Sequence, residues 1–231
     1  MRYDFDRVID RRTIDSAKWT AYPKDVLPLW VADSDFQCPQ PVIDAVMKIA
    51  ETGVYGYPNG HAGIVENATV SWCARHYGLE VLPSEVQYCP SMCFGLAVAI
   101  RAFTKPGGKV LMQVPAYPPF IELTKSNGRI PSMNALKLVE GRFEIDFEDF
   151  ERRAADPECT LFLLCSPHNP TGRVFSKEEL ERIVSICCRH NVVILADEVH
   201  SGFVFKGEHT TLLTLSEAAS SITVYGHSPS K

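Results

Sequence analysis

The stretch TLFLLCSPHNPTGRVFSKEELERIVSICCRHNVVILADEVH, residues 160–200, decides the fold. It opens with one apolar run, residues 160–165, and ends with a second, residues 192–196, followed by Asp197. Between the two runs, Ser176 and Glu179 form the capping-box pattern of a helix start. A buried strand, a helix and another buried strand in this order predict two parallel strands of one sheet.

The same alternation of strand and helix patterns continues on both sides of this unit. Because the predicted strands are almost continuously apolar, we expect an α/β fold with a mainly parallel (mixed) sheet, covered by helices on both faces. The predicted strands are residues 86–89, 109–114, 129–134, 160–165, 192–196 and 221–225. The predicted helices are residues 41–53, 64–77, 95–103, 119–125, 147–155 and 176–190.

The chain divides into two parts by composition. Residues 1–36 are polar and irregular, apart from an apolar stretch at 26–32, and we assign them to a smaller domain near the mouth of the site. Residues 37–231 form the larger domain. The sequence stops at Lys231, just after a predicted strand and before the helix that would cover it. We therefore expect the larger domain to be incomplete at its C-terminus.

Composition excludes several classes of function. The net charge of −5 and the pI of about 5.8 argue against a general nucleic-acid surface. The sequence has no apolar run long enough to span a bilayer and no signal-peptide core. Its eight cysteines are scattered without a CxxC pair, which favours reduced thiols in the cytoplasm over a disulfide framework or a metal site. We expect a cytoplasmic protein without a nucleic-acid or membrane partner.

Three polar residues follow predicted strands: Asn169 in SPHNPTG, Asp197 in ADEVH and Lys231 in SPSK. Ligands of parallel α/β sheets bind beyond the carboxyl ends of the strands. Together the three residues can hold pyridoxal 5′-phosphate: Lys231 as a Schiff-base amine, Asp197 on the ring nitrogen and Asn169 on the ring hydroxyl. Taken singly, each has a plain alternative as a surface lysine, a helix cap or a turn residue, but the set and its order favour the cofactor.

Further residues are candidates for the cofactor phosphate. Ser228, three residues before Lys231, can donate its hydroxyl, and the backbone at Met92 and Cys93, before a predicted helix, can donate N–H groups. Tyr57 in the loop YGYP can reach a phosphate through its hydroxyl. An ordinary loop serine, helix start and loop tyrosine are the alternatives.

Other candidates would lie against the ring or the substrate. Tyr117 in PAYPPF can stack on the ring, and His200 can lie near the ring hydroxyl. Trp30, Ala32 and Asp33 in LPLWVADSDF can line a substrate mouth. The alternatives are plain aromatic packing, a structural histidine and an N-terminal arm that only packs.

Together these motifs resemble the fold-type I pyridoxal phosphate enzymes of the aspartate aminotransferase superfamily. LPLWVADSDF, YGYP, AFTKPGGKVLMQVPAYPPF, LLCSPHNPTGRVFSKEEL, ADEVHSGFVF and SPSK are similar to the cystathionine β-lyase-like C–S lyases of the MalY/PatB type. His200 stands where typical aminotransferases carry tyrosine, which favours the lyase branch. The resemblance covers essentially the whole chain, with two departures. Ser91-Met92 stands where the family usually has glycine, and the C-terminal arginine expected to bind the substrate carboxylate is not in this sequence.

The resemblance implies a function. It implies a pyridoxal phosphate-dependent C–S β-lyase that converts cystathionine- or cysteine-type amino acids to pyruvate, ammonia and a thiol, with Lys231 catalytic and Ala32, Tyr117 and Asn169 at the substrate. It also implies a homodimer, in which Tyr57 reaches the phosphate of the neighbouring subunit. A class I/II aminotransferase, and a cofactor-binding regulator that acts through a protein partner, remain open as alternatives.

Overall fold

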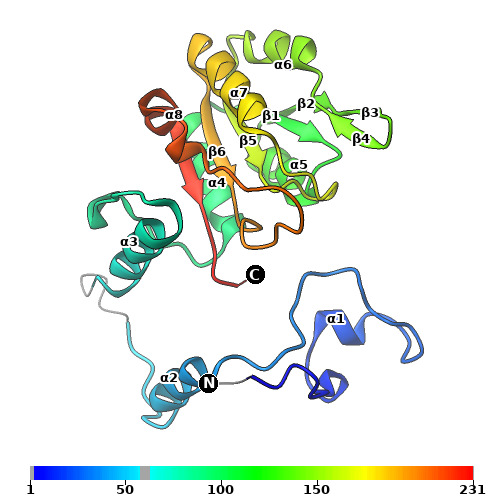
Figure 1. The fold of residues 1–231 in the computed structure, drawn as a ribbon, viewed down its shortest axis with the longest axis vertical. Helices are drawn as coiled ribbons and strands as arrows, with labels where there is room; N and C mark the ends of the chain where they lie inside the picture. The colour runs from blue at the N-terminus through cyan, green and yellow to red at the C-terminus, as the bar shows by residue number, and fades with distance from the viewer. Residues whose placement is uncertain (1–2, 58–62, 231) are drawn as a thin grey trace. The chain divides into compact units, whose positions relative to one another are not determined.

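The computed structural model describes residues 3–57 and 63–230, which fall into two compact units at that gap (Figure 1). Lys231 lies outside the described residues. The assignment of residues 1–36 to a smaller domain stays a prediction. Among the helices that the structure describes, none is long and apolar enough to cross a bilayer.

The N-terminal unit is organised around the carboxylate of Asp35. Lys18 Nζ donates to this carboxylate at 2.6 Å and the indole N–H of Trp19 at 2.7 Å. The guanidinium of Arg11 forms ion pairs with the carboxylates of Asp33, at 2.8 Å, and Asp35, at 3.2 Å. These contacts fix the segment that contains Ala32. The helices of the unit are η1 (Arg11–Thr13), α1 (Ala17–Thr20) and α2 (Gln40–Ala50), the last of which confirms the helix predicted from residue 41.

The larger unit is built on a parallel sheet with the strand order β2-β1-β5-β6-β7, and every recorded pairing in it is parallel. The predicted mainly parallel α/β fold is therefore confirmed. Among the described strands, the only antiparallel pair is a separate two-stranded ribbon, β3-β4, and an isolated antiparallel bridge joins His168 to Arg173. The strands are β1 (Lys109–Val114), β2 (Ile130–Ala135), β3 (Lys137–Val139), β4 (Arg142–Glu144), β5 (Cys159–Cys165), β6 (Val193–Asp197) and β7 (Thr223–Gly226).

Helices cover both faces of this sheet, as Figure 1 shows. Side chains alternate along each strand, so one set of strand residues packs under α4 and α5 and the other under α6, α7 and α8. On the second face, the buried rings of Phe150 and Phe162 meet edge-on at 4.9 Å. The helices are α3 (Ile64–Tyr77), η2 (Pro83–Glu85), α4 (Met92–Phe103), α5 (Pro118–Ser126), α6 (Phe147–Ala154), α7 (Lys177–Arg189), η3 (Leu212–Thr214) and α8 (Glu217–Ile222).

Local sequence signals explain where the main elements begin and end. Ser176 Oγ accepts from the Glu179 N–H while the Glu179 carboxylate accepts from the Ser176 N–H, which is the capping box predicted for α7. Gly78 ends α3 in the left-handed conformation, with φ of 66°, which glycine adopts without steric cost.

Two predictions of local structure need correction, and some elements were not predicted. Residues 86–89 are not a strand, because a strand needs a paired neighbour and none lies against them within residues 63–230. The last strand begins at Thr223 and not at Ser221, since a helix that was not predicted, α8, runs to Ile222 and is capped by Ser216. The β3-β4 hairpin was also not predicted. Its turn has positive φ at Glu140 and Gly141, as a tight two-residue hairpin requires.

Candidate active site

The carboxyl ends of three adjacent strands form the floor of the site. Cys165 pairs in register with Asp197, and Asp197 pairs with Gly226. The ladder continues one step further, because the Ser166 N–H donates to the Asp197 carbonyl at 3.0 Å and the Glu198 N–H donates to the Gly226 carbonyl at 2.9 Å. These backbone bonds fix Asp197 where ligands of parallel sheets bind.

Asp197 is a buried carboxylate, with 3% of the residue exposed. Leu195, two residues earlier on β6, belongs to the core under α4 and α5, so Asp197 faces the same side of the sheet. Its Oδ1 accepts from the Val199 N–H at 3.3 Å. The chain thus presents a preset negative charge on the face that also carries the start of α4.

The start of α4 contributes backbone donors. Ser91 caps the helix by accepting from the Phe94 N–H at 3.2 Å, and the Gly95 N–H bonds to the Ser91 carbonyl at 3.1 Å. The first N–H groups of a helix, here those of Met92 and Cys93, have no acceptor within it and favour an anion. The predicted phosphate position therefore has the backbone that it needs.

The departure from glycine at this turn has a structural explanation. Ser91 is extended, with φ of −161° and ψ of 161°, a conformation open to any residue, and Met92 already belongs to the helix. The Met92 side chain fills the space over Gly226, where a Cβ would lie only 2.8 Å from the methionine sulfur. The extended backbone of Ser91 therefore needs no glycine, and the Met92 side chain occupies the space that a side chain at position 226 would enter.

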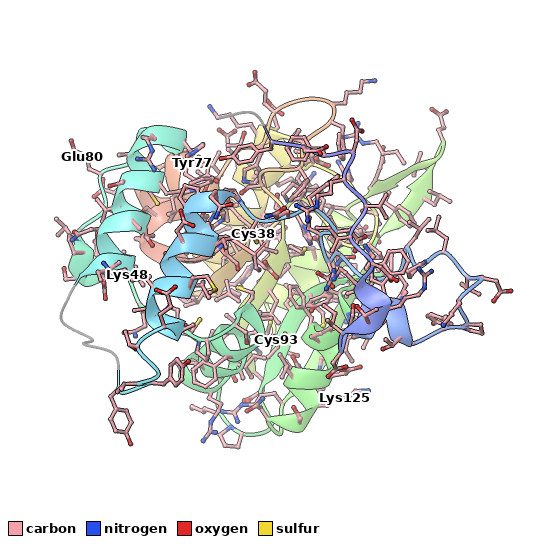
Figure 2. All side chains as sticks on the ribbon, turned by 90° about the horizontal axis from the view of Figure 1, so that it is seen from below. Cys38, Lys48, Tyr77, Glu80, Cys93 and Lys125 are labelled. Atoms are coloured by element: carbon pink, nitrogen blue, oxygen red, sulfur yellow. The ribbon has the colours of Figure 1, made fainter. Side chains whose placement is uncertain are left out.

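Tyr117 lies beside these residues. It lines a small hollow together with Cys165 and Asn169, and its hydroxyl is 3.9 Å from the sulfur of Cys93, which is labelled in Figure 2. Burial, the contact with Cys93 and the charge of Asp197 raise the pKa of Tyr117 to about 12. The ring at the site is therefore a neutral phenol at physiological pH, suited to stacking.

Asn169 lies half-buried in the loop after β5. The loop closes on itself, because the His168 N–H donates to the Arg173 carbonyl and the Gly172 N–H donates to the His168 carbonyl, both at 2.7 Å. The Asn169 N–H is bound by the sulfur of Cys165 at 3.3 Å. The structure therefore brings Asn169, Asp197, Tyr117 and the start of α4 together through the hollow, the register and the contacts above.

Ser228 and His200 lie on the segments that leave these strands. Ser228 is two residues after β7, and its Oγ is 2.7 Å from that of Ser230. His200 lies in the turn that follows Asp197, where its carbonyl accepts from the Phe203 N–H at 2.9 Å. Their predicted bonds to the cofactor stay predictions, as do the roles of Trp30, Ala32, Asp33 and Tyr57 in the N-terminal unit and of Lys231.

An aromatic stack supports the segment that leads to Ser228. The ring of His227 stacks on Trp72 of α3 at 5.1 Å, and Trp72 stacks on His76 at 3.7 Å. Tyr77 of the same helix, labelled in Figure 2, accepts from the Tyr225 hydroxyl at 3.4 Å. Helix α3 thereby holds β7 and the residues that follow it.

Sequence reasoning missed two residues that line the hollow, Gln113 and Cys165. Gln113 is 3% exposed, and neither end of its amide has a hydrogen-bond partner in the described part of the chain. Cys165 bonds to the loop that holds Asn169. The available signal was position, since both residues stand at or near the carboxyl ends of predicted strands, where site residues gather.

The pKa of His168 is lowered to about 4, by burial and then by the positive charge of Arg173. An unfolded histidine titrates near pH 6.5, so between about pH 6.5 and 4 the unfolded state holds one more proton than the native state. Stability is then lost as pH falls through this window, at up to ~1.4 kcal/mol per pH unit. His168→Asn is expected to remove this slope in urea unfolding curves measured between about pH 4.5 and 7.5. An unchanged slope in His168→Asn would show that His168 is not the group responsible.

The donor set of the site fits the cofactor expected from the sequence. A buried carboxylate suits a protonated ring nitrogen, an amide suits a phenolic oxygen, and a neutral aromatic ring suits stacking. The helix start offers N–H groups for a phosphate, and the missing Cβ of Gly226 leaves room beside them for Met92. The ring nitrogen, the ring hydroxyl, the ring face and the phosphate of pyridoxal phosphate thus each have a matching group within residues 63–230.

Comparison with known proteins agrees with this geometry. The family model described as "Aminotransferase class I and II" matches residues 24–230. The chain belongs to the aminotransferase class I and II family. This family member is 36% identical over 234 residues to cystathionine beta-lyase PatB of Bacillus subtilis, covering 99% of this chain and 60% of the relative. It is 38% identical over 226 residues to cystathionine beta-lyase of Corynebacterium glutamicum, covering 97% and 58%.

The structure of this family member is similar to solved structures of enzymes that contain the cofactor. Cystalysin from Treponema denticola, whose crystal structure contains pyridoxal 5′-phosphate, is similar with a TM-score of 0.92 and 29% identity, over 100% of this chain and 60% of that one. The predicted resemblance to the superfamily and to its lyases is confirmed. The chain spans about 60% of the length of the relatives that it matches.

Proposed function

We propose that the full-length protein is a pyridoxal phosphate-dependent C–S β-lyase, which cleaves cystathionine- or cysteine-type amino acids to pyruvate, ammonia and a thiol. The observation that carries the proposal is the convergence of Asp197, Asn169, Tyr117 and the start of α4 at the carboxyl ends of the sheet. The names of the relatives, two of them cystathionine beta-lyases, support the lyase reaction.

Each of these residues has a role in binding the cofactor. The bound cofactor supplies an electron-withdrawing ring that stabilises negative charge at the α-carbon of an amino acid. Asp197 keeps the ring nitrogen protonated through its buried charge, and Asn169 donates to the ring hydroxyl. Tyr117 stacks on the ring. The phosphate would be held by the N–H groups of Met92 and Cys93, by the hydroxyl of Ser228 and by the hydroxyl of Tyr57 from the neighbouring subunit, with His200 near the ring hydroxyl.

The reaction itself depends on one amine. Lys231 would hold the cofactor through its side-chain amine, and the same amine would accept the α-proton of the bound amino acid. Loss of that proton allows the Cβ–S bond to break with the electron pair leaving on sulfur as a thiolate. Uptake of water then gives pyruvate and ammonia. Ala32, Tyr117 and Asn169 are proposed to lie against the substrate.

The experiment is an activity assay on the full-length protein. With cystathionine or cysteine as the sole substrate, it is expected to release pyruvate and a thiol in equal amounts. An aminotransferase is the second candidate, because the family model carries that description. Turnover that requires a 2-oxo acid and yields no pyruvate from cystathionine would reject the lyase and support the aminotransferase.

Assembly and location are part of the same proposal. We propose a homodimer in which Tyr57 contacts the phosphate of the neighbouring subunit. Analytical ultracentrifugation tests this proposal, and an active enzyme that sediments as a monomer would contradict it. All eight cysteines are free thiols, which favours the reducing cytoplasm. Recovery of the native protein in an extracytoplasmic fraction would contradict that location.

A further inference from the structure

We propose that the thiol of Cys165 is a positioning group. It holds Asn169 at the cofactor site by a bridge of hydrogen bonds to the backbone of the loop, at Pro167 and at Asn169. The inference rests on the proposed function, since Asn169 is assigned to the cofactor there. Cys165 itself would touch neither substrate nor cofactor. It acts through the backbone of the loop.

The geometry of the bridge is specific. Cys165 Sγ donates to the Pro167 carbonyl at 3.4 Å and accepts from the Asn169 N–H at 3.3 Å. One side chain at the end of β5 therefore satisfies both a carbonyl and an amide of the loop that follows it.

The composition of the loop makes this bridge important. Pro167 and Pro170 have no N–H, so the only backbone donors from 167 to 170 are those of His168 and Asn169. The His168 N–H is already bonded to the Arg173 carbonyl at 2.7 Å. The bond to sulfur is thus the anchor recorded for the Asn169 amide.

The surroundings keep the thiol in the form that the bridge needs. Cys165 is 3% exposed, and burial together with the charge of Asp197 raises its pKa to about 12. At neutral pH the sulfur therefore keeps the proton that it donates to Pro167. Since Cys165 also pairs in register with Asp197, it lies beside both proposed cofactor ligands.

A cysteine that only packs in the core lacks the bonds to the loop that Cys165 makes. Cys187 is also fully buried, but it lies in α7 among the core residues of the opposite face of the sheet. Burial raises its pKa as well. Cys187 is thus a matched control for the loss of a buried thiol remote from Asn169.

The test compares Cys165→Ala, Cys165→Ser and Cys187→Ala in the full-length protein, and measures pyridoxal phosphate affinity by titration of the apoprotein. Cys165→Ala is expected to weaken binding about tenfold, because the Asn169 amide loses its partner. Serine keeps a donor and an acceptor, so Cys165→Ser is expected to stay within about threefold of wild type. Cys187→Ala is expected to bind as the wild type does.

A double-mutant cycle tests whether the effect passes through Asn169. Asn169→Ala alone is expected to weaken binding about tenfold, and adding Cys165→Ala to it should weaken binding no more than about threefold further. A loss of affinity of about a hundredfold in the double variant, the product of the two single losses, would overturn the proposal, because the two residues would then act independently.

A readout without cofactor separates this inference from the proposed function. Hydrogen exchange of the Asn169 amide in the apoprotein, followed by mass spectrometry of peptides covering residues 166–173, is expected to be about tenfold or more faster in Cys165→Ala and restored in Cys165→Ser. Unchanged exchange in Cys165→Ala would overturn the inference. If the wild type bound no pyridoxal phosphate, the proposed function would fail, and exchange alone would decide whether the thiol holds Asn169.

Discussion

Lys231→Ala in the full-length protein is expected to lower pyruvate release by about 10³-fold or more, because a single amine both links the cofactor and accepts the α-proton. Pyridoxal phosphate is expected to remain bound through the start of α4 and Ser228, but without the visible absorbance of the lysine-linked form. Steady-state assays with cystathionine and an absorbance spectrum of the purified variant measure both effects.

The control for this variant is Lys177→Ala, which removes an exposed lysine from the first turn of α7. It is expected to retain wild-type turnover and absorbance. If Lys231→Ala kept near-normal pyruvate release and the lysine-linked spectrum, another lysine would be the catalyst. The interpretation of the SPSK motif would then be wrong.

Asp197→Ala is expected to lower turnover by about 10²-fold or more, while leaving Lys231 able to link the cofactor. The carboxylate is buried and positioned by the Val199 N–H, so its charge is preset beside the ring nitrogen. Without it the ring nitrogen would lose its proton and withdraw electrons less strongly. Pyruvate release and the retained absorbance of the lysine-linked form measure the two parts of this expectation.

Glu198 provides a closely matched control, since it is the next residue and is also a buried acid. Its carboxylate bonds to His209 Nε2 at 2.7 Å and to the Thr211 hydroxyl at 3.2 Å, away from the proposed ring position. Glu198→Gln keeps the shape of the side chain and is expected to reduce turnover far less than Asp197→Ala. Equal losses in the two variants would indicate that both act by disturbing the loop and not through charge at the ring.

Much of the fold was predictable because it rests on local signals. The strand Lys109–Val114 matches its prediction residue for residue, β5 begins one residue earlier than predicted, and β6 is shifted by one residue at both ends. The capping box of α7 and the glycine that ends α3 are patterns of a few neighbouring residues, and the structure has both. Burial on both faces leaves such strands apolar throughout, so their parallel arrangement can be inferred from the sequence.

Elements that depend on a distant partner were predicted less well. Residues 86–89 have the composition of a strand but lack a neighbouring strand in the described part of the chain. Ile222 is apolar enough for a strand, yet Ser221 and Ile222 finish α8, because the Ser216 cap and the core contact of Ala219 favour a helix there. Hydrogen-bond partners and core contacts lie outside any local window, which is why these boundaries were wrong.

The sequence by itself determined the order along the chain of the five strands of the parallel sheet and the motifs that place Asn169, Asp197 and Ser228 after strands, because strand burial, caps and turns are encoded by neighbouring residues. Only the tertiary structure decided how residues far apart in sequence meet. It set the register of Cys165, Asp197 and Gly226, packed Met92 over Gly226, placed Tyr117 beside Cys93 and bonded the Cys165 thiol to the loop. The physical reason is that these contacts arise from strand register and from packing between elements, which no short stretch of sequence specifies.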